Sequence, residues 1–348
     1  MTRWIASLCL FFLSIAPTFA ITVEKQCHPV AGANVSLGEA TSVEIGSRSV
    51  EQQMNGGLTC DSSGVTVVGT NWIRVKINNS SDVALKDPVS GDSIPLMLYA
   101  SASKETRLDY GTTHNYTAFT FIGGSPNIKT FPLYIAVGPT AARLHAGTYR
   151  ATISLTWYWL ICPNSQGLGV CYGEGWDKSR GLIDRCGWES CTLGPLNWGS
   201  GATTSVTVSL TIANDCIMNA PNVDFGTAPV PAAFSPQIGA LSIRCTNGSL
   251  YTVGMSDGAN AAGNVRQLRH AAGTAAMRYD IYKSATGTDR WGSAGAERRA
   301  STTADLNGDP GSHNGSANQV FNYRIEIPAQ HSVPAGTYTD NVVVDVKF

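Results

Sequence analysis

The strongest constraint on the fold is that this chain of 348 residues repeats itself at a spacing of 189 residues. Cys27 and Cys216 lie 189 residues apart, and so do the Gly-Thr-Tyr tripeptides that begin at Gly147 and Gly336. A second cysteine follows the first one in each copy. Self-similarity at a fixed spacing is the signature of repeated structural units. The sequence therefore predicts two copies of one domain, each closed by its own disulfide.

The first twenty residues have the pattern of a secretory signal peptide. Arg3 precedes an apolar stretch over 4–16, and the small residues of 18–20 form a cleavage site. We expect the chain to be exported through the periplasm, where an even number of cysteines favours disulfides. The eight cysteines that remain after cleavage are Cys27, Cys60, Cys162, Cys171, Cys186, Cys191, Cys216 and Cys245.

Composition excludes several classes of function. Charged residues make up 14% of the chain and the formal net charge is −1, so no basic surface is available to hold nucleic acid. No stretch after residue 20 reaches the roughly 18 uninterrupted apolar residues of a membrane-spanning helix. No nucleophile elbow, phosphate-binding glycine loop or paired histidine motif is present, so we expect no enzyme and no cofactor.

The segments after each Gly-Thr-Tyr alternate between apolar and polar residues, which is typical of half-buried strands. No window shows a convincing helical period, so the prediction is an all-β chain of two antiparallel β-sandwiches. The alternating apolar residues are Ile153, Leu155, Trp157 and Trp159 in copy one and Val342, Val344, Val346 and Phe348 in copy two.

The two copies differ by one strand. Copy one continues beyond its alternating strand and adds a second one over 204–213, whereas copy two stops at Phe348. A sandwich without its last strand exposes apolar core and an unpaired edge. We therefore expect the second sandwich to be incomplete and to require a strand donated by another chain.

Several short motifs recur in order in copy two. They are Cys216 followed by Val223-Asp-Phe-Gly226, then Arg244-Cys-Thr-Asn-Gly248, Tyr279-Asp-Ile-Tyr282, Trp291-Gly292 and Pro334-Ala-Gly-Thr-Tyr-Thr-Asp340. By these motifs copy two, over about 216–348, resembles a spore coat protein U-type domain, and copy one, over about 27–213, resembles a diverged relative of it. Two such domains in one secreted chain resemble the tip subunit of an archaic chaperone–usher pilus.

The resemblance implies Ig-like sandwiches and a set of partners. These are a periplasmic pilus chaperone, an outer-membrane usher, an adjacent subunit that donates a strand, and an abiotic or host surface. Val342, Val344, Val346 and Phe348 would bind the chaperone strand or the donated strand. Only the six residues 21–26 precede Cys27, which are too few to act as a donor, so the subunit is expected to end the fibre. The expected location is the pilus tip at the cell surface.

An insertion over 160–201 interrupts copy one and is expected to be the binding element. It and the strand before it hold five of the eight tryptophans, and its four cysteines allow three disulfide connectivities. Exposed apolar patches usually mark binding sites. The predicted surface-binding residues are Trp176, Leu182, Ile183, Trp188, Leu193 and Trp198. A second apolar loop is expected at the same end from residues 99–115, with Leu108 and Tyr110.

Other interpretations of the insertion stay open. Its aromatic residues can instead tuck against the sandwich in a compact loop. Asp177, Asp184 and Glu189 lie near tryptophans and could bind a sugar, which would make the tip lectin-like. The chain could also be a coat or fibre subunit without a ligand. A zinc cluster is disfavoured because the insertion has no Cys-x2-Cys pair.

The predicted organisation has three parts, namely a signal peptide over 1–20, an N-terminal adhesin domain over 21–213 that completes itself, and a C-terminal pilin domain over 214–348.

Overall fold

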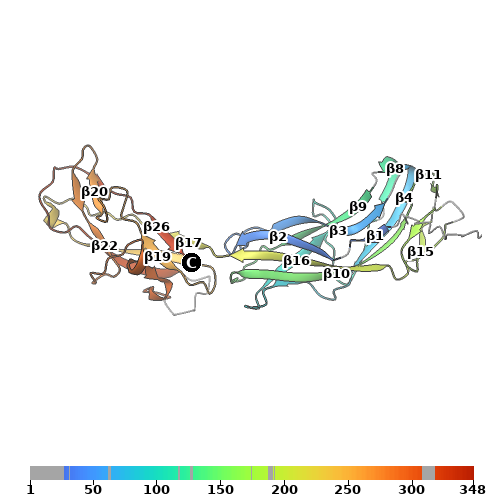
Figure 1. Cartoon of the computed structure of the whole chain (residues 1–348), viewed down its shortest axis with the longest axis horizontal. Helices are drawn as coiled ribbons and strands as arrows, with labels where there is room; N and C mark the ends of the chain where they lie inside the picture. The colour runs from blue at the N-terminus through green and yellow to red at the C-terminus, as the bar shows by residue number, and fades with distance from the viewer. Residues whose placement is uncertain are drawn as a thin grey trace, which may run out of the picture.

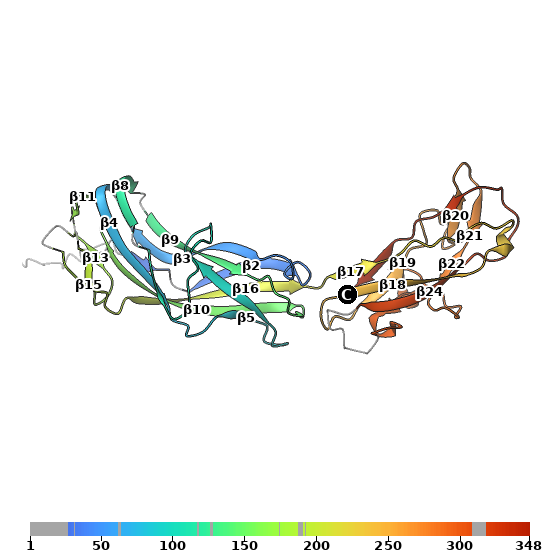
Figure 2. The same ribbon diagram turned by 180° about the vertical axis from the view of Figure 1, so that it is seen from behind.

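The structure is a computed structural model of the whole chain, and it describes most residues from Cys27 onwards. The described residues are 27–30, 32–61, 64–116, 118–125, 128–173, 175–186, 191, 193–307 and 318–348. The predicted signal peptide and the short segment 21–26 lie outside this range. Strands predominate, and two sandwiches lie end to end in an elongated molecule (Figures 1 and 2). Within the described residues, no helix has the length and apolar character needed to cross a membrane.

We refer to residues 27–213 as domain 1 and to residues 214–348 as domain 2. The strands of domain 1 are β1 (Cys27–Pro29), β2 (Ala33–Thr41), β3 (Val50–Asp61), β4 (Gly64–Ile77), β5 (Ala84–Lys86), β6 (Ser93–Tyr99), β7 (Thr113–Asn115), β8 (Ala118–Ser125), β9 (Ile128–Val137), β10 (Gly147–Ile161), β11 (Gln166–Gly167), β12 (Val170–Cys171), β13 (Asp177–Lys178), β14 (Ile183–Asp184), β15 (Pro195–Asn197) and β16 (Ala202–Ala213).

Two layers of strands form domain 1, as the alternating apolar pattern predicts. One layer has the order β1-β3-β9-β6-β5, and the other has the order β2-β16-β10-β4, with β7 and β8 on the far side of β4 and β11 on the same side of β4 as β10. The inward-facing residues of both layers, among them Trp157 and Trp159, form one buried core. The chain thus folds its first copy into an Ig-like sandwich, with the two strand tryptophans inside it.

Domain 2 is a smaller Ig-like sandwich with its own separate core. Its layers have the strand orders β17-β18-β24-β22 and β23-β19-β26, and a third small sheet, β21-β20-β25, lies at the end remote from domain 1 (Figure 1). The strands are β17 (Cys216–Asn219), β18 (Gln237–Cys245), β19 (Thr252–Met255), β20 (Gln267–His270), β21 (Ala276–Arg278), β22 (Asp280–Tyr282), β23 (Arg299–Ala300), β24 (Gln319–Glu326), β25 (Tyr338–Thr339) and β26 (Val344–Lys347), and the 3-10 helices are η1 (Pro231–Ala233), η2 (Gly295–Glu297) and η3 (Ser301–Thr303).

Each domain has a disulfide that joins its first strand to the antiparallel strand beside it, Cys27–Cys60 between β1 and β3 in domain 1 and Cys216–Cys245 between β17 and β18 in domain 2. The four cysteines of the insertion pair locally, since Cys162 bonds to Cys171 and Cys186 bonds to Cys191. The pairing that the sequence left open is therefore sequential along the chain.

The domains meet directly, because only Asn214 and Asp215 separate β16 from β17. The Oγ atoms of Ser42 and Thr246 lie 2.8 Å apart across the junction, and the Asn247 amide donates a hydrogen bond to the carbonyl oxygen of Arg143 at 3.3 Å. The short connection and these contacts hold the sandwiches end to end.

Candidate functional site

The insertion builds a small core of its own at the end of domain 1 remote from domain 2 (Figure 1). Leu160, Leu182 and Cys191 are buried at its centre. Leu182 is 9% exposed, so its prediction as a surface-binding residue is corrected. The side chain supports the loop from inside, because the β13 region folds back over the end of β10.

Two of the predicted surface tryptophans cover this small core. Trp176 packs on Trp72 with ring centroids 5.6 Å apart, and Trp198 lies under the guanidinium of Arg74 at 4.1 Å. Gly194 has a φ of +69°, and a Cβ there would lie 2.5 Å from the indole Nε1 of Trp72. Trp176 and Trp198 are both half-buried, which matches the alternative of a compact loop whose aromatic residues tuck against the sandwich. Trp188 and Glu189 lie outside the described residues.

Among the described residues, the exposed apolar side chains of the tip are aliphatic apart from Tyr172. Ile183 and Leu193 were predicted from the sequence, and the structure places both in the exposed class together with residues that the prediction did not select. The exposed apolar side chains at this end are Val67, Leu168, Tyr172, Ile183, Leu193 and Leu196, each between 44% and 77% exposed. Hydrogen bonds join the segments that carry them, from Leu168 N to Val67 O at 3.0 Å and from Cys191 N to Gly169 O at 2.7 Å. We call these six side chains the apolar tip.

Leu168 occupies an unusual backbone conformation at the turn of the β11–β12 hairpin. Its φ is +49°, followed by +80° at Gly169, as in the two-residue hairpin turns that favour Asn-Gly. The left-handed conformation destabilises a leucine by roughly 1–2 kcal/mol. Strain of this kind tends to occur at functional sites. The Leu168-Gly169 pair, between Gly167 and Val170, was the signal in the sequence that could have identified this turn residue.

The acidic residues that suggested sugar binding hold the insertion together. The Asp177 carboxylate accepts hydrogen bonds from the Cys27 amide at 2.5 Å and from the Trp159 indole at 3.2 Å. Asp184 forms an ion pair with Lys178 and accepts a hydrogen bond from the Cys186 amide. Both carboxylates are thus engaged in structure.

The second apolar loop expected from residues 99–115 does not contribute to the tip. Leu108 is fully buried in the core of domain 1. Tyr110 packs against that core, and its hydroxyl donates a hydrogen bond to the Leu96 carbonyl at 2.9 Å. The loop returns to the sheet because β7 pairs with β4, so its apolar residues face inward.

A different feature distinguishes domain 2. A groove runs along it between the segments 220–228 and 338–344, with two adjoining cavities of about 210 and 580 Å³. Its floor is made of core residues from both layers, namely Leu241, Met255, Ile281, Tyr323 and Ile325. The sandwich is therefore open along one side.

In domain 1 the same place is filled by β16. This strand lies antiparallel to β10 and parallel to β2, and it buries Val206, Val208, Leu210 and Ile212 to within 1% exposure. The Asn-Val-x-Leu-Gly sequence that starts at Asn34 in β2 recurs as Asn-Val-x-Phe-Gly at Asn222, and β10 corresponds to the segment that begins at Gly336. The groove of domain 2 is thus the empty counterpart of the β16 position.

Both walls of the groove lose regular strand structure where β16 is missing. Residues 220–228 form no strand, and the counterpart of the single strand β10 is divided into β25 and β26, with 340–343 between them unassigned. The cause is that each wall lacks the neighbour with which β2 and β10 pair in domain 1.

The structure places the four predicted strand-binding residues along one wall, but only two of them line the groove. Val342 and Val344 face the cavity. Val346 is half-buried opposite Val253, and Phe348 is 55% exposed with its ring 6.3 Å from that of Tyr251. The opposite wall, with Val223 and Phe225, was not predicted.

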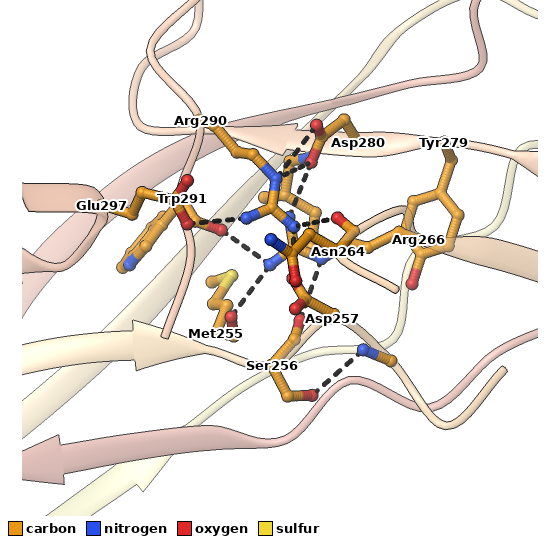
Figure 3. A network of polar contacts seen from close by, with 12 residues as sticks. Met255, Ser256, Asp257, Asn264, Arg266, Tyr279, Asp280, Arg290, Trp291 and Glu297 are labelled. Atoms are coloured by element: carbon orange, nitrogen blue, oxygen red, sulfur yellow. Dashed lines mark hydrogen bonds and ion pairs between the residues drawn. The ribbon is translucent and has the colours of Figure 1, made fainter. Parts of the chain in front are cut away.

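A buried arginine network secures the base of this wall (Figure 3). The Arg266 side chain is 0% exposed and donates hydrogen bonds to the carbonyl oxygens of Met255, Ser256 and Trp291, and to Asp280 at 2.7 Å. Ser256 in turn bonds to both backbone groups of Val343. Burial lowers the pKa of Arg266, and the charge of Arg290 acts in the same direction, while Asp280 opposes both. The network ties the end of β19 to the groove wall.

No group of three or more histidine, cysteine, aspartate or glutamate side chains suited to a metal ion occurs among the residues that the structure describes.

The comparisons with known proteins agree with this architecture. The family model of the Spore Coat Protein U domain matches residues 14–156 and 202–345, leaving out most of the insertion. No curated protein sequence matches the chain. The chain shares its fold with the structure of the CsuC–CsuE chaperone–tip adhesion subunit pre-assembly complex of the archaic chaperone–usher Csu pili of Acinetobacter baumannii, with a TM-score of 0.66, 22% identity, and coverage of 92% of this chain and 100% of that one.

Two further structures superpose poorly on this chain. The CupB6 tip adhesin of Pseudomonas aeruginosa gives a TM-score of 0.30 at 11% identity, with 92% of each chain covered. The CooA pilin subunit of enterotoxigenic Escherichia coli gives 0.28 at 12% identity, covering 54% of this chain and 97% of that one. The family match covers more than half of the chain in two copies, one for each sandwich. The chain therefore belongs to the Spore Coat Protein U domain family.

Proposed function

We propose that this chain is the tip subunit of a chaperone–usher pilus, in which domain 2 accepts a strand from the next subunit and domain 1 attaches the fibre to a surface. As a member of the Spore Coat Protein U domain family it is a non-enzymatic structural protein. The domain limits of the proposal are 21–213 for the adhesin domain and 214–348 for the pilin domain. Export through the periplasm would bring it to the cell surface.

The contrast between β16 and the empty groove carries this proposal. Domain 1 buries the four apolar residues of β16 between β2 and β10, whereas in domain 2 a groove takes that place and the buried residues Leu241 and Ile281 line its floor. An added strand supplies backbone hydrogen bonds to both walls and apolar side chains to the floor. Domain 2 is complete only with a strand from another chain.

The connection between the two domains suggests how the next subunit is attached. The second family match begins at residue 202 and so includes β16, which by sequence leads domain 2 and by structure completes domain 1. A donor strand in the same orientation would leave domain 2 near Gly336, at the end remote from domain 1, where β20 and β25 lie (Figure 1). The next subunit would then continue the line of the two domains.

A periplasmic chaperone would protect the groove before assembly. The structure with a TM-score of 0.66 is a complex of a chaperone with a tip adhesion subunit, which supports this partner. The outer-membrane usher would then exchange the chaperone strand for that of the adjacent subunit. Val342 and Val344 would contact either strand, and Val346 and Phe348 would extend this wall towards the junction.

The apolar tip would attach the fibre to abiotic or host surfaces and so promote biofilm formation. Its side chains project from hairpins that are held by two disulfides and a small core. Such a rigid loop exposes apolar groups without unfolding, and burying them at a surface yields about 25 cal/mol per Å². Of the residues predicted from the sequence, Ile183 and Leu193 are part of this surface, while Trp176 and Trp198 would contribute only their exposed edges.

The groove is tested with the mature full-length chain, purified from its chaperone by exchange against a synthetic twelve-residue donor peptide. The peptide should raise the midpoint of domain 2 unfolding and protect its amides from exchange, with domain 1 unchanged. A peptide with charged residues at its four apolar positions is the matched control. A chain that is monomeric and equally stable without chaperone or peptide would disprove the proposed strand donation.

The tip is tested by retention of the same complex on hydrophobic plastic and on immobilised glycans. Leu168→Asp and Leu193→Asp should abolish retention on plastic, because each places a charge in the contact. Val89→Asp is the control, since Val89 is 93% exposed but lies in the turn between β5 and β6, outside the apolar tip. Selective glycan retention would favour a lectin, and unchanged attachment would favour a fibre subunit without a ligand.

A further inference from the structure

Two carboxylates line the groove of domain 2, and of these Asp224 is exposed whereas Asp340 is half-buried. Asp340 lines both groove cavities. It occupies the counterpart of Ala151, because Gly147-Thr-Tyr and Gly336-Thr-Tyr are equivalent. Inward-facing residues alternate along β10, where Ala151 is paired with Val208 of β16. Asp340 therefore faces the position that the donor strand must fill.

Hydrogen bonds from Tyr279 and Asn260 hold the side chain of Asp340 in place. The Tyr279 hydroxyl donates a hydrogen bond to Oδ2 at 2.7 Å, and the backbone amide and side-chain amide of Asn260 donate to Oδ1 at 3.0 and 3.2 Å. A Cβ on Gly258 would lie only 1.9 Å from Oδ2, so the loop approaches closely. The carboxylate cannot turn away when a strand enters.

The polar pair replaces an apolar pair of domain 1. The isolated bridges between Tyr99 and Arg107 and between Tyr282 and Arg290 are equivalent, which makes Leu96 the counterpart of Tyr279. Domain 1 thus places Leu96 and Ala151 where domain 2 places Tyr279 and Asp340. A polar position among apolar inward-facing ones, such as half-buried Asp340 beside Val342 and Val344, is a known means of fixing the register of a strand or helix against its partner.

We propose that Asp340 sets the register of the incoming strand and selects one with a small or hydroxyl-bearing residue opposite it. The inference rests on the proposed strand donation. A β-branched apolar residue at this position would remove water from a carboxylate without offering a hydrogen bond, which is costly. A serine or glycine leaves room for a further hydrogen bond, direct or through a water molecule, to the Asp340 carboxylate.

The same device would keep domain 2 from capturing β16 of a second copy of this chain. In the register of domain 1, β16 places Val208 opposite Ala151. In domain 2 the same register would press Val208 against Asp340. The strand that completes domain 1 would therefore be rejected by domain 2, which disfavours association of tips with one another.

The test uses the mature chain and synthetic peptides with the sequence of residues 202–213. We expect the peptide with Val208→Ser to bind at least tenfold more tightly than the unchanged peptide. A peptide with Val206→Ser, at the neighbouring inward position opposite Val342, is the control and should bind more weakly than both. Affinity is measured by fluorescence anisotropy of a labelled peptide.

Two variants of the chain complete the cycle. Asp340→Ala should reverse the preference for the Val208→Ser peptide, so that the unchanged peptide binds best. Asp340→Asn keeps the shape and the fold, and should reduce the preference for the Val208→Ser peptide over the unchanged one to less than threefold. Equal binding of the serine and valine peptides to the wild-type chain would overturn the role of Asp340 and leave strand donation intact. Binding of no peptide at all would overturn both.

Discussion

The indole Nε1 of Trp159 donates a hydrogen bond to the Asp177 carboxylate at 3.2 Å, and this contact joins the end of strand β10 to the insertion that follows it. The same carboxylate accepts the backbone amide of Cys27, the first described residue of β1. One side chain thus fixes the insertion to two parts of domain 1. Binding loops need a rigid support if their exposed groups are to keep one arrangement.

Replacing Asp177 should loosen the insertion without unfolding the sandwich. Asp177→Asn removes the negative charge from the carboxylate whose Oδ2 accepts both hydrogen bonds, so a cost of about 1–3 kcal/mol is expected. Hydrogen exchange should show faster exchange in β13 and β14, with the β10–β16 pairs unchanged. Asp82→Asn is the control, because the Asp82 side chain is 81% exposed. Equal protection in both variants would contradict this role.

Replacing Leu168 should separate stability from attachment. Leu168→Gly relieves the left-handed conformation at φ +49° and should stabilise the hairpin by roughly 1 kcal/mol. It also removes an apolar side chain that is 77% exposed, so retention on hydrophobic plastic should fall. Thermal unfolding and retention are measured on the same sample. A gain in retention would exclude Leu168 from the contact surface.

Loss of a disulfide should destabilise either the insertion alone or the whole of domain 1, depending on which disulfide is removed. Loss of Cys162–Cys171, which closes nine residues, is expected to cost about 2–3 kcal/mol and to affect the insertion. Loss of Cys27–Cys60, which closes 33 residues between two core strands, should cost about 4 kcal/mol and lower the unfolding midpoint of all of domain 1. Serine variants of each pair, followed by calorimetry and by fluorescence of the insertion tryptophans, distinguish the two effects.

Removing Arg266 should destabilise domain 2 alone. Arg266→Met fills part of the volume but leaves the carbonyl oxygens of Met255 and Trp291 without their donor, at an expected cost of about 3–5 kcal/mol. Denaturation of the peptide-bound chain should show an earlier transition for domain 2 and an unchanged one for domain 1. Arg269→Met, at an exposed position of β20, should leave both transitions in place.

His145 of domain 1 contacts Asn247 of domain 2, and its ring also bonds to Asp92, so this part of domain 1 should lose stability in acid through Asp92. Burial alone would raise the pKa of Asp92, but hydrogen bonds from the backbone and ring of His145 outweigh it and hold the pKa below the usual 3.8. A lowered folded-state pKa stabilises the protein fully above pH 3.8 and stops doing so as the pH falls through the lower value. Asp92→Asn should therefore narrow the difference in stability between pH 5 and pH 2, measured by urea unfolding.

Much of the fold could be predicted because its signals are local. Alternation of Ile153, Leu155 and Trp157 predicts a strand without reference to the rest of the chain, and the 189-residue spacing predicts the second copy. An open groove in domain 2 was also expected, since the strand over 204–213 was expected in copy one alone. The open groove between 220–228 and 338–344 agrees with that expectation.

The tip was harder to predict because composition does not reveal which side of a loop faces water. Trp176, Leu182 and Leu193 look equally suited to a surface in the sequence, yet Leu182 is buried, Trp176 half-buried and Leu193 70% exposed. Leu108 was expected at the tip and lies in the core, because the pairing of β7 with β4 turns its loop inward.

The sequence by itself determined the all-β class, the two copies and the cysteine framework, because strand periodicity lies in neighbouring residues and the repeat is found by comparing the two halves of the sequence. Only the tertiary structure decided which insertion side chains are exposed, how Cys162, Cys171, Cys186 and Cys191 pair, and that Asp340 faces the groove. These depend on segments far apart in the chain, such as Cys27 with Asp177 and Asn260 with Asp340, whose approach is set by packing and not by local pattern.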